Sequence, residues 1–536
     1  MNRPLATSAL ALILGAGPAL ADVTPAEVWD SLRTSYEKAG YAIAIGAEEA
    51  TDERIALSDV VLTVEGEAEA PDMVLTMPSV VLEAVGDGTV RSVVEQPMTI
   101  ESTGTAPDGD APMGFTMTLD MPGNETITSG TPEALTHDVT IPTLTMDGRA
   151  LDERNEVPLT ASMTNVTGRQ TVNTAADGAS NQTFEGRADS MEMRISASGP
   201  SLAAEETLDA APETAPDAAP AEPTEGASDQ TDRFEAVVTV ADLTMQGDGT
   251  SPAGQVNFGS APTEALEAGF GGNGRFGMGA TTISFSASTL TADGTRNDTE
   301  GGVEAASGSL AVGMSAEGLS YEGSLTEMQT RLSGTDLPFP IAYGATENRF
   351  RLAMPVLAAE EEQPFALTYV LDGLTLDDAI WQALDPEAAL PRDPASLTID
   401  LEGQAVLSQG LMDPEAAQAA APGPDGAAPM PMTPRSLAIK ALSLDAVGAT
   451  VDLSGALTFG EDPTQPVGTI EGTFGGVNGL LDKLVAMGVV PAEQLMGPRM
   501  MMAMFARPVE GAEDQLQTEI EFREGGSIFA NGQQIQ

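Results

Sequence analysis

Short runs in which apolar and polar residues alternate recur along most of this chain, and they constrain its fold more than any other feature. From about Ile55 onward, Thr, Val, Ile and Leu alternate with polar residues between Gly, Asp, Asn and Pro, as in residues 136–147, 234–245 and 280–293. Period-two alternation places every second side chain on the same face, which is typical of a half-buried β-strand. The sequence therefore predicts a mainly β protein.

Several of these runs break the period once at their centre. In Ile55-Leu57-Val60-Leu62 the apolar positions are separated by two, three and two residues. The same spacing returns in Val139-Ile141-Leu144-Met146, Val238-Val240-Leu243-Met245, Phe285-Ala287-Leu290-Ala292, Met314-Ala316-Leu319-Tyr321, Tyr369-Leu371-Leu374-Leu376 and Leu437-Ile439-Leu442-Leu444. A β-bulge inserts such an extra residue and bends the strand, so the pattern predicts large, curved, bulged antiparallel sheets. The alternative is that a turn, or the junction of two short strands, lies at each step.

A few short helices interrupt the β pattern. Near the N-terminus, Thr24 and Glu27 have the spacing of a capping box, and Gly40 ends the predicted helix. Further helices are predicted near 377–384 and near 477–505, and a hairpin that turns at Gly525-Gly526 closes the chain.

Composition divides the chain into segments. Residues 1–21 are expected to be a signal peptide, 22–202 an N-terminal β-rich region and 233–536 a C-terminal β-rich region. Between them, residues 203–232 contain Ala, Pro and acidic residues with no aromatic residue, which predicts a disordered linker or a long loop. A second loop is predicted at 412–434, which is rich in Ala, Pro and Gly.

The first residues predict export. Arg3 precedes an apolar stretch over 5–17, and Ala19-Leu20-Ala21 matches the small-x-small rule for signal peptidase, so cleavage is expected before Asp22. The alternative is an uncleaved anchor, although the stretch is shorter than the roughly 20 residues a spanning helix needs. We expect a periplasmic protein, with an extracellular location as the alternative, and no membrane span after cleavage.

The charge balance limits the partners. The 536 residues include 81 acidic and 23 basic residues, a formal net charge of −58. Such a chain repels nucleic acid, so no nucleic-acid partner is expected. The acidic residues predict a hydrated surface, with a cation-binding surface as the alternative.

The residues offer little chemistry. There is no cysteine, and His137 is the only histidine, which we expect to be an ordinary residue at a strand edge. The acidic pairs Asp108–Asp110 and Asp377–Asp378 lie in no complete calcium loop. Gly269 to Gly274 matches G-x-G-x-x-G, but a helical pattern precedes it and a strand follows it, the reverse of a dinucleotide site. We therefore predict no catalytic, cofactor-binding or metal-binding residues and no cofactor.

A methionine cluster near the C-terminus has two interpretations. Met500, Met501 and Met504 are expected to lie along one helical face as adaptable core filling. Because thioethers bind Cu(I), a copper site is the alternative.

Part of the chain resembles a known family. The resemblance lies in residues 468–475, 477–484, 488–490, 522–526 and 531–532, together with the Val28-Trp29 helix and the segment 374–381. These residues resemble an uncharacterised family of exported bacterial proteins defined by a domain of unknown function. The strand texture is also similar to AsmA-like and YdgA-like envelope proteins, which implies a curved β surface and lipid handling. Those proteins keep an N-terminal membrane anchor, whereas cleavage is expected here, and the family supplies no functional residues.

Three functions follow as hypotheses. The first is a non-enzymatic, envelope-associated periplasmic protein that binds a lipid-like ligand in a curved β groove, with a lipid or an envelope protein as its partner. The second is an acidic structural or interaction protein of the periplasm or cell surface. The third is a hydrolase with an unrecognised site.

Overall fold

A computed structural model describes most of the chain. The described residues are 22–38, 40–64, 72–95, 97–105, 112–151, 156–200, 231–254, 258, 261–291, 295–412, 432–460 and 462–536. The expected signal peptide, the Asp108–Asp110 pair, nearly all of the predicted linker at 203–232 and most of the predicted loop at 412–434 lie outside these residues.

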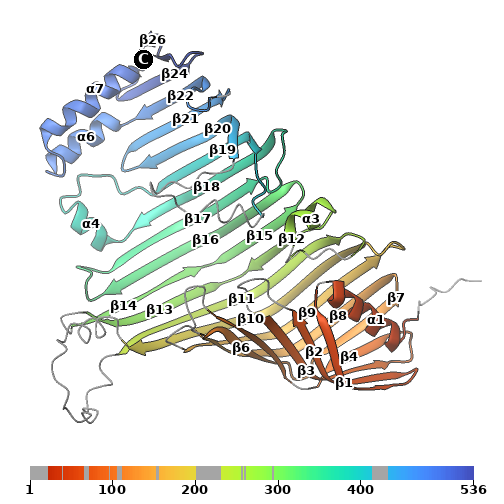
Figure 1. The fold of residues 1–536 in the computed structure, drawn as a ribbon. Helices are drawn as coiled ribbons and strands as arrows, with labels where there is room; N and C mark the ends of the chain where they lie inside the picture. The colour runs from red at the N-terminus through yellow and green to blue at the C-terminus, as the bar shows by residue number, and fades with distance from the viewer. Residues whose placement is uncertain are drawn as a thin grey trace, which may run out of the picture.

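The protein is mainly β, as predicted, and its 26 described strands form one antiparallel sheet rather than several (Figure 1). The N-terminal strands are β1 (Ala42–Ala50), β2 (Arg54–Val64), β3 (Asp72–Ala84), β4 (Val90–Val94), β5 (Met98–Thr105), β6 (Pro112–Asp120), β7 (Glu125–Thr131), β8 (Ala134–Leu151), β9 (Glu156–Thr174) and β10 (Ser180–Pro200). The central strands are β11 (Thr231–Ser251), β12 (Gly271–Met278), β13 (Thr281–Leu290), β14 (Arg296–Ala305), β15 (Ser307–Ser315), β16 (Gly318–Gly334), β17 (Ile341–Met354) and β18 (Gln363–Leu376). The C-terminal strands are β19 (Ala395–Leu407), β20 (Met432–Ala446), β21 (Ala449–Thr458), β22 (Val467–Gly475), β23 (Arg507–Pro508), β24 (Gln515–Phe522), β25 (Ile528–Ala530) and β26 (Gln533–Gln534).

The helices are short and lie mostly where the sequence predicts them. They are α1 (Pro25–Lys38), α3 (Pro262–Glu267), α4 (Asp378–Leu384), α6 (Val477–Ala486), the 3-10 helix η2 (Ala492–Leu495) and α7 (Met496–Phe505). The capping box of α1 forms as predicted, because Glu27 N donates to Thr24 Oγ1 at 3.3 Å and Thr24 N donates to Glu27 Oε2 at 2.9 Å. The closing hairpin of β24 and β25 also forms, across Gly525 and Gly526.

The strands follow one another across the sheet almost in chain order, and one arrangement occurs twice. The long strand β3 pairs with β5 through its first half and with β4 through its second half, and β6 and β7 then pair with the long strand β8. The long strand β11 pairs with β13 and β12 in the same way, and β14 and β15 pair with β16. The sheet therefore contains two copies of one six-strand topology.

The sheet also runs unbroken past the predicted linker. β10 and β11 flank residues 201–230, and they pair over twenty positions from Ser180↔Ser251 to Pro200↔Thr231. The regions before and after the linker are consequently parts of one sheet.

A line of backbone irregularities crosses the sheet and explains the two-three-two spacing. It includes the left-handed residues Asp59, Asn165, Asp242, Glu327 and Gly373, with φ between 49° and 65°, and we call it the crease. At Asp59 the register is kept, since Ile45↔Val60 and Ala47↔Ser58 lie on either side of it. All four apolar residues of the first predicted segment are buried, so the crease does reset the side-chain phase.

The seven segments with this spacing have different outcomes. Residues 371–374 and 439–442 contain register shifts, as a β-bulge predicts. The segments at 55–62 and 238–245 keep their register, and each contains a left-handed residue of the crease, Asp59 or Asp242, in place of the predicted insertion. The segment at 139–146 also keeps its register, and there the left-handed residue is Asn165 of the partner strand β9, between the pairs Ile141↔Val166 and Thr143↔Thr164. The segment at 314–321 is a turn between β15 and β16, as the alternative held. In the segment at 285–292, Ala292 lies outside the described residues.

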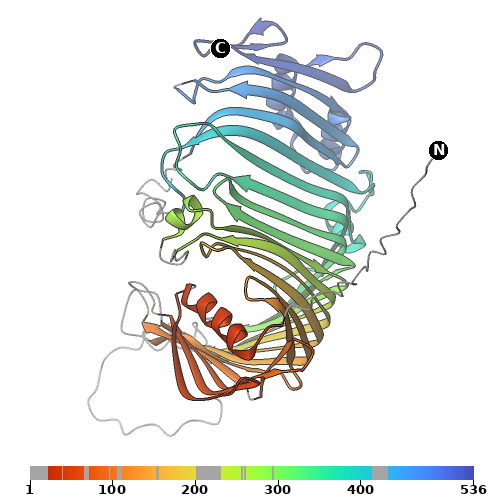
Figure 2. The same ribbon diagram turned by 90° about the vertical axis from the view of Figure 1, so that its right-hand side faces the viewer.

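The best-buried core lies at the N-terminal end, where Figure 2 shows α1 inside the curl of the first strands. Val28 and Trp29 of α1 are buried against Leu57, Leu62 and Leu82 of β2 and β3, each of which is fully buried. Leu32 and Tyr36 extend the same helix face. Burial of these side chains holds the helix in the curl.

Candidate ligand-binding surface

One side of the sheet is apolar over nearly its whole length. Cross-strand partners point to the same side of a sheet, so the register gives the composition of each face. On one side of the crease, a row crosses from β1 to β17 through Ile43, Leu62, Leu75, Ile100, Met117, Gly148, Leu159, Ile195, Ala236, Phe285, Gly301, Leu332 and Ile341. On the other side, a row crosses from β12 to β21 through Phe276, Leu310, Gly323, Phe350, Tyr369, Ile399, Leu442 and Leu453. We call this side the apolar face.

Another apolar row runs beside the one from Phe276 to Leu453. It passes through Val312, Tyr321, Leu352, Leu367, Leu401, Ile439, Gly455, Ile470 and Ile520 on β15 to β24. The bulge at Lys440 keeps Ile439 and Leu442 on the same face, because the register shifts between these two residues.

The apolar face is covered at one end and exposed further along. Near β1 to β4, α1 covers it and its side chains are buried. From β11 onward eight of its large side chains are exposed to between 37% and 41%, namely Phe234, Phe276, Ile283, Leu310, Tyr321, Phe350, Leu367 and Leu444, and the others in the rows are half-buried. Single exposed apolar residues are ordinary, but a contiguous patch marks a binding surface.

Phenylalanine rings on this face lie across glycines of the neighbouring strand. A Cβ at Gly323 would come within 2.3 Å of the Phe350 ring, and one at Gly403 within 2.4 Å of the Phe365 ring. Gly301 stands in the same relation to Phe285. The glycines let the rings lie flat on the sheet, which makes the face smooth and apolar.

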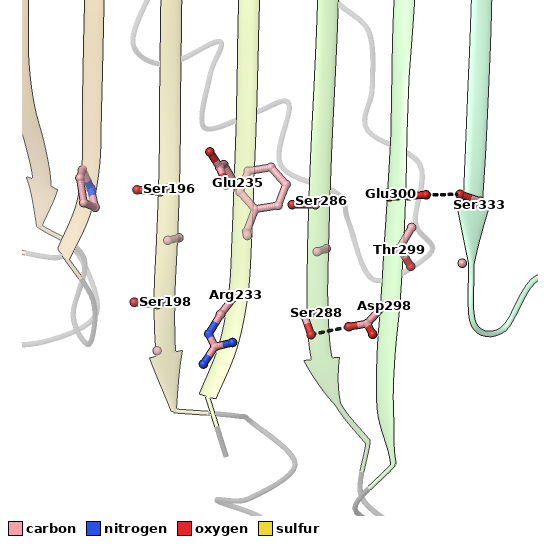
Figure 3. A pocket seen from close by; sticks show the side chains of 16 residues that line it. Ser196, Ser198, Arg233, Glu235, Ser286, Ser288, Asp298, Thr299, Glu300 and Ser333 are labelled. Carbon is pink, nitrogen blue, oxygen red and sulfur yellow. Dashed lines mark hydrogen bonds between the residues drawn. The ribbon is translucent and has the colours of Figure 1, made fainter. Parts of the chain in front are cut away.

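The opposite face is polar. Its rows carry Ser, Thr, Arg, Asp and Glu, and Arg194 Nη1 lies 2.9 Å from Glu235 Oε1 across β10 and β11. A hollow of 1180 Å³ lies on this face. Figure 3 shows the polar side chains from β10, β11, β13, β14 and β16 that line it, and Phe234 and Pro158 also contribute to its lining. Within it, Ser288 Oγ donates to Asp298 Oδ1 at 2.5 Å and Ser333 Oγ to Glu300 Oε1 at 3.1 Å. Partners within the sheet therefore already engage these carboxylates.

A second hollow of 840 Å³ lies over β12 and β15 to β21, also on the polar face. Small side chains give it room, including Gly313, Ala353 and Ala438, while Arg351 and Glu402 also line it. Its charged lining makes it a poorer match for an apolar ligand than the other face.

His137 is buried within β8, which corrects the prediction of a strand-edge residue. Its side chain is only 9% exposed, because β8 begins at Ala134 and the register places His137 beside Thr128 of β7 on the apolar face. Thr128 Oγ1 and His137 Nδ1 are 2.8 Å apart. Burial lowers the pKa of His137, and the nearby charge of Asp138 opposes that shift.

The Asp377–Asp378 pair has structural partners. Asp377 is the N-cap of α4 and accepts a hydrogen bond from Ala379 N at 2.9 Å, while Asp378 lies 3.7 Å from Arg392. Beyond the helix, the fully buried Asp385 accepts backbone hydrogen bonds from Ala389 and Leu390, and these lower its pKa. Asp377 thus caps the start of α4, and Asp385 stabilises the turn that follows the helix.

The glycine-rich segment has the predicted arrangement. α3 precedes it and Gly271 to Met278 form β12, so it lacks the strand–turn–helix order of a dinucleotide site.

The methionine cluster is not core filling. Met496, Met500, Met501 and Met504 of α7 are exposed to between 53% and 75%, so that prediction is wrong. The helix packs through its other side, where Met502 and Phe505 are half-buried.

Within the described ranges, no cluster of three or more His, Asp or Glu side chains is placed to hold a metal ion. No helix among the described residues has the length and hydropathy needed to cross a membrane. Comparison with protein-family models, with curated proteins and with solved structures found no match.

Sequence reasoning missed the extent of the apolar face. The two-three-two spacing indicated this face, because a change of phase at the step of three keeps the apolar residues before and after it on the same face of the strand. What the spacing could not show is which strands are neighbours, and therefore that the rows join.

Proposed function

We propose that this is a non-enzymatic, envelope-associated periplasmic protein that binds a lipid-like ligand along the exposed part of its apolar face. The observation that carries the proposal is that exposed and half-buried apolar side chains line the same face from β11 to β20. The resemblance to envelope proteins and the signal-peptide pattern of residues 1–21 support the location.

The dimensions of the patch suit an acyl chain. The row from Phe276 to Leu453 crosses eight strands, and seven steps of about 4.8 Å give a length of roughly 34 Å. This exceeds the thickness of a bilayer's hydrocarbon core, about 30 Å, which two acyl chains fill end to end. An acyl chain along this row would contact apolar side chains over its whole length.

The charge distribution is compatible with this role. A net charge of −58 keeps the molecules apart in solution even though one face is apolar. It also favours neutral or zwitterionic ligands over anionic ones, because an anionic headgroup would be repelled.

The test compares two matched double variants on the same strands. Y321E/L367E places two charges in one row of the apolar face, whereas S320E/A366E places two charges at the adjacent positions on the polar face. Protein purified from its own host is extracted with solvent and examined by native mass spectrometry, and binding of the neutral fluorophore N-phenylnaphthylamine is titrated.

We expect the wild type and S320E/A366E to carry an extractable lipid and to bind the fluorophore. We expect Y321E/L367E to lose the lipid and to bind at least about tenfold more weakly, a change of about 1.4 kcal/mol. A wild type that is repeatedly ligand-free overturns the proposal. Loss of binding only in S320E/A366E would place the ligand in the 840 Å³ hollow instead.

The other two hypotheses make different predictions for the same preparation. A stable co-purifying protein with no small molecule would support an acidic structural or interaction protein. A hydrolase would lose its activity on substitution of His137 or Asp377, the candidate residues that the described chain offers.

A further inference from the structure

Helix α7 is apolar on both sides, but it packs through only one. Thr518 Oγ1 and Asn531 Nδ2 donate to Phe505 O at 2.5 Å and 2.8 Å, which fixes the end of the helix to β24. Leu495 and Ala506, which flank the helix, are buried. The packing thus accounts for one side of the helix.

The other side forms an exposed stripe. Met496, Met500 and Met504 are spaced by four residues, so they lie above one another on the helix, with Met501 beside them. Their side chains are exposed to 75%, 68%, 53% and 56%, respectively. The stripe extends over eight residues, or about 12 Å. A contiguous apolar stripe that is this exposed is typical of an interaction surface.

The local charge differs from that of the rest of the chain. Residues 494–509 contain two arginines, Arg499 and Arg507, and no acidic residue, and Glu493 and Glu510 lie directly outside this range, whereas acidic residues outnumber basic ones 81 to 23 in the whole chain. Arg499 forms an ion pair with Asp482 of α6, and Arg507 is exposed beside the helix. An apolar stripe flanked by arginines is typical of a helix that lies in a membrane interface.

The C-terminal end of α7 is also close to the apolar face. Thr518, which holds the end of α7, is in register with Gly472 and Leu453, and Leu453 ends the row that begins at Phe276. The end of α7 is therefore attached on the side of β24 that continues the proposed ligand surface.

We propose that the exposed methionine stripe of α7 docks on the surface of a lipid bilayer and that the ligand reaches the apolar face at this end of the sheet. A second copy of the chain fits less well, because two molecules that each carry −58 repel one another. Flexible thioether side chains suit a fluid partner such as acyl chains. The docking itself rests on α7, and only the route of the ligand rests on the proposed function.

The test measures co-sedimentation of the purified protein with vesicles of phosphatidylcholine, alone and mixed with phosphatidylglycerol. The variant M500E/M504E places two charges in the stripe, at exposed positions that do not support the packing of α7. The control V85E/L384E makes the same charge change at apolar residues that are 50% and 59% exposed elsewhere. We expect the wild type and the control to bind vesicles, and M500E/M504E to bind at least about tenfold more weakly because the thioethers no longer enter the interface.

Two results would overturn the docking: a wild type that does not bind vesicles, or M500E/M504E that binds as the wild type does. Light scattering after size exclusion supplies a third, since a wild-type dimer that becomes monomeric in M500E/M504E would make the stripe an interface between copies. Fluorophore binding separates the two proposals. If the docking is correct, M500E/M504E keeps N-phenylnaphthylamine binding and loses vesicle binding, whereas failure of the proposed function abolishes fluorophore binding in the wild type too.

Discussion

Truncating one leucine in the covered part of the apolar face and one in its exposed part distinguishes a covered surface from an open one. Leu82 of β3 is fully buried beneath α1, whereas Leu367 of β18 is 40% exposed on the same face. The substitutions L82A and L367A remove the same atoms, so the difference between their costs reports only on the surroundings.

The expected costs follow from burial. L82A loses the transfer free energy of the removed atoms and leaves a cavity under α1, which costs about 2–5 kcal/mol. The deleted part of Leu367 corresponds to roughly 2.4 kcal/mol of transfer free energy at full burial, and about three-fifths of that, about 1.4 kcal/mol, applies at its observed exposure. No closed cavity forms on an open face, so no further cost is expected for L367A.

The measurement is urea denaturation of both variants, together with hydrogen exchange of the amides in β2, β3, β17 and β18. Exchange assigns the loss of stability to the affected strands even if the long sheet opens locally. A cost for L367A equal to that for L82A would refute the reasoning, because Leu367 would then belong to a closed core rather than to a ligand surface. A cost for L82A below about 1 kcal/mol would show that α1 does not cover Leu82 as tightly as its burial indicates.

Three further predictions concern the backbone, pH and a buried hydrogen bond. The backbone of Glu327 is left-handed, a conformation that glycine adopts without strain and a β-branched residue does not. In urea denaturation, Glu327→Gly should therefore stabilise the protein by roughly 0.5–1 kcal/mol, and Glu327→Val should destabilise it. The reverse order would contradict backbone strain at the crease. Because burial lowers the folded pKa of His137, protonation favours the unfolded chain, and stability should fall as pH drops below about 6.5 towards the folded pKa. Urea midpoints between pH 8 and pH 5 should show this decline in the wild type and less of it in His137→Gln; equal declines would assign it to other groups. Thr128→Val should cost about 1–3 kcal/mol at pH 8, because it leaves the buried imidazole without its partner.

Some features of the protein follow from short stretches of sequence. Thr24 and Glu27 are three residues apart and cap α1 as predicted, because capping depends only on local backbone geometry. Residues 371–374 contain a register shift, as their spacing predicts. The mainly β class follows in the same way, from period-two alternation in many separate runs.

Other features depended on contacts between residues far apart in the chain. His137 looked like a strand-edge residue, but it pairs with β7 on one side and β9 on the other, and its side chain is buried. The methionines of α7 have a pattern typical of core residues, yet the sheet offers the helix only one packing surface. In both cases burial is a property of the neighbours, which a local pattern does not specify.

Local sequence patterns specify the β class, the steps in side-chain phase, the capping of α1 and the acidic balance, because each arises from residues within a few positions of one another. The fold was needed to show that the strands form one sheet, that their apolar residues join into rows from β1 to β24, and that α1 covers one end of that face while much of it is open. Strand pairing joins residues separated by long stretches of chain, and the exposure of each side chain depends on which surfaces then pack together.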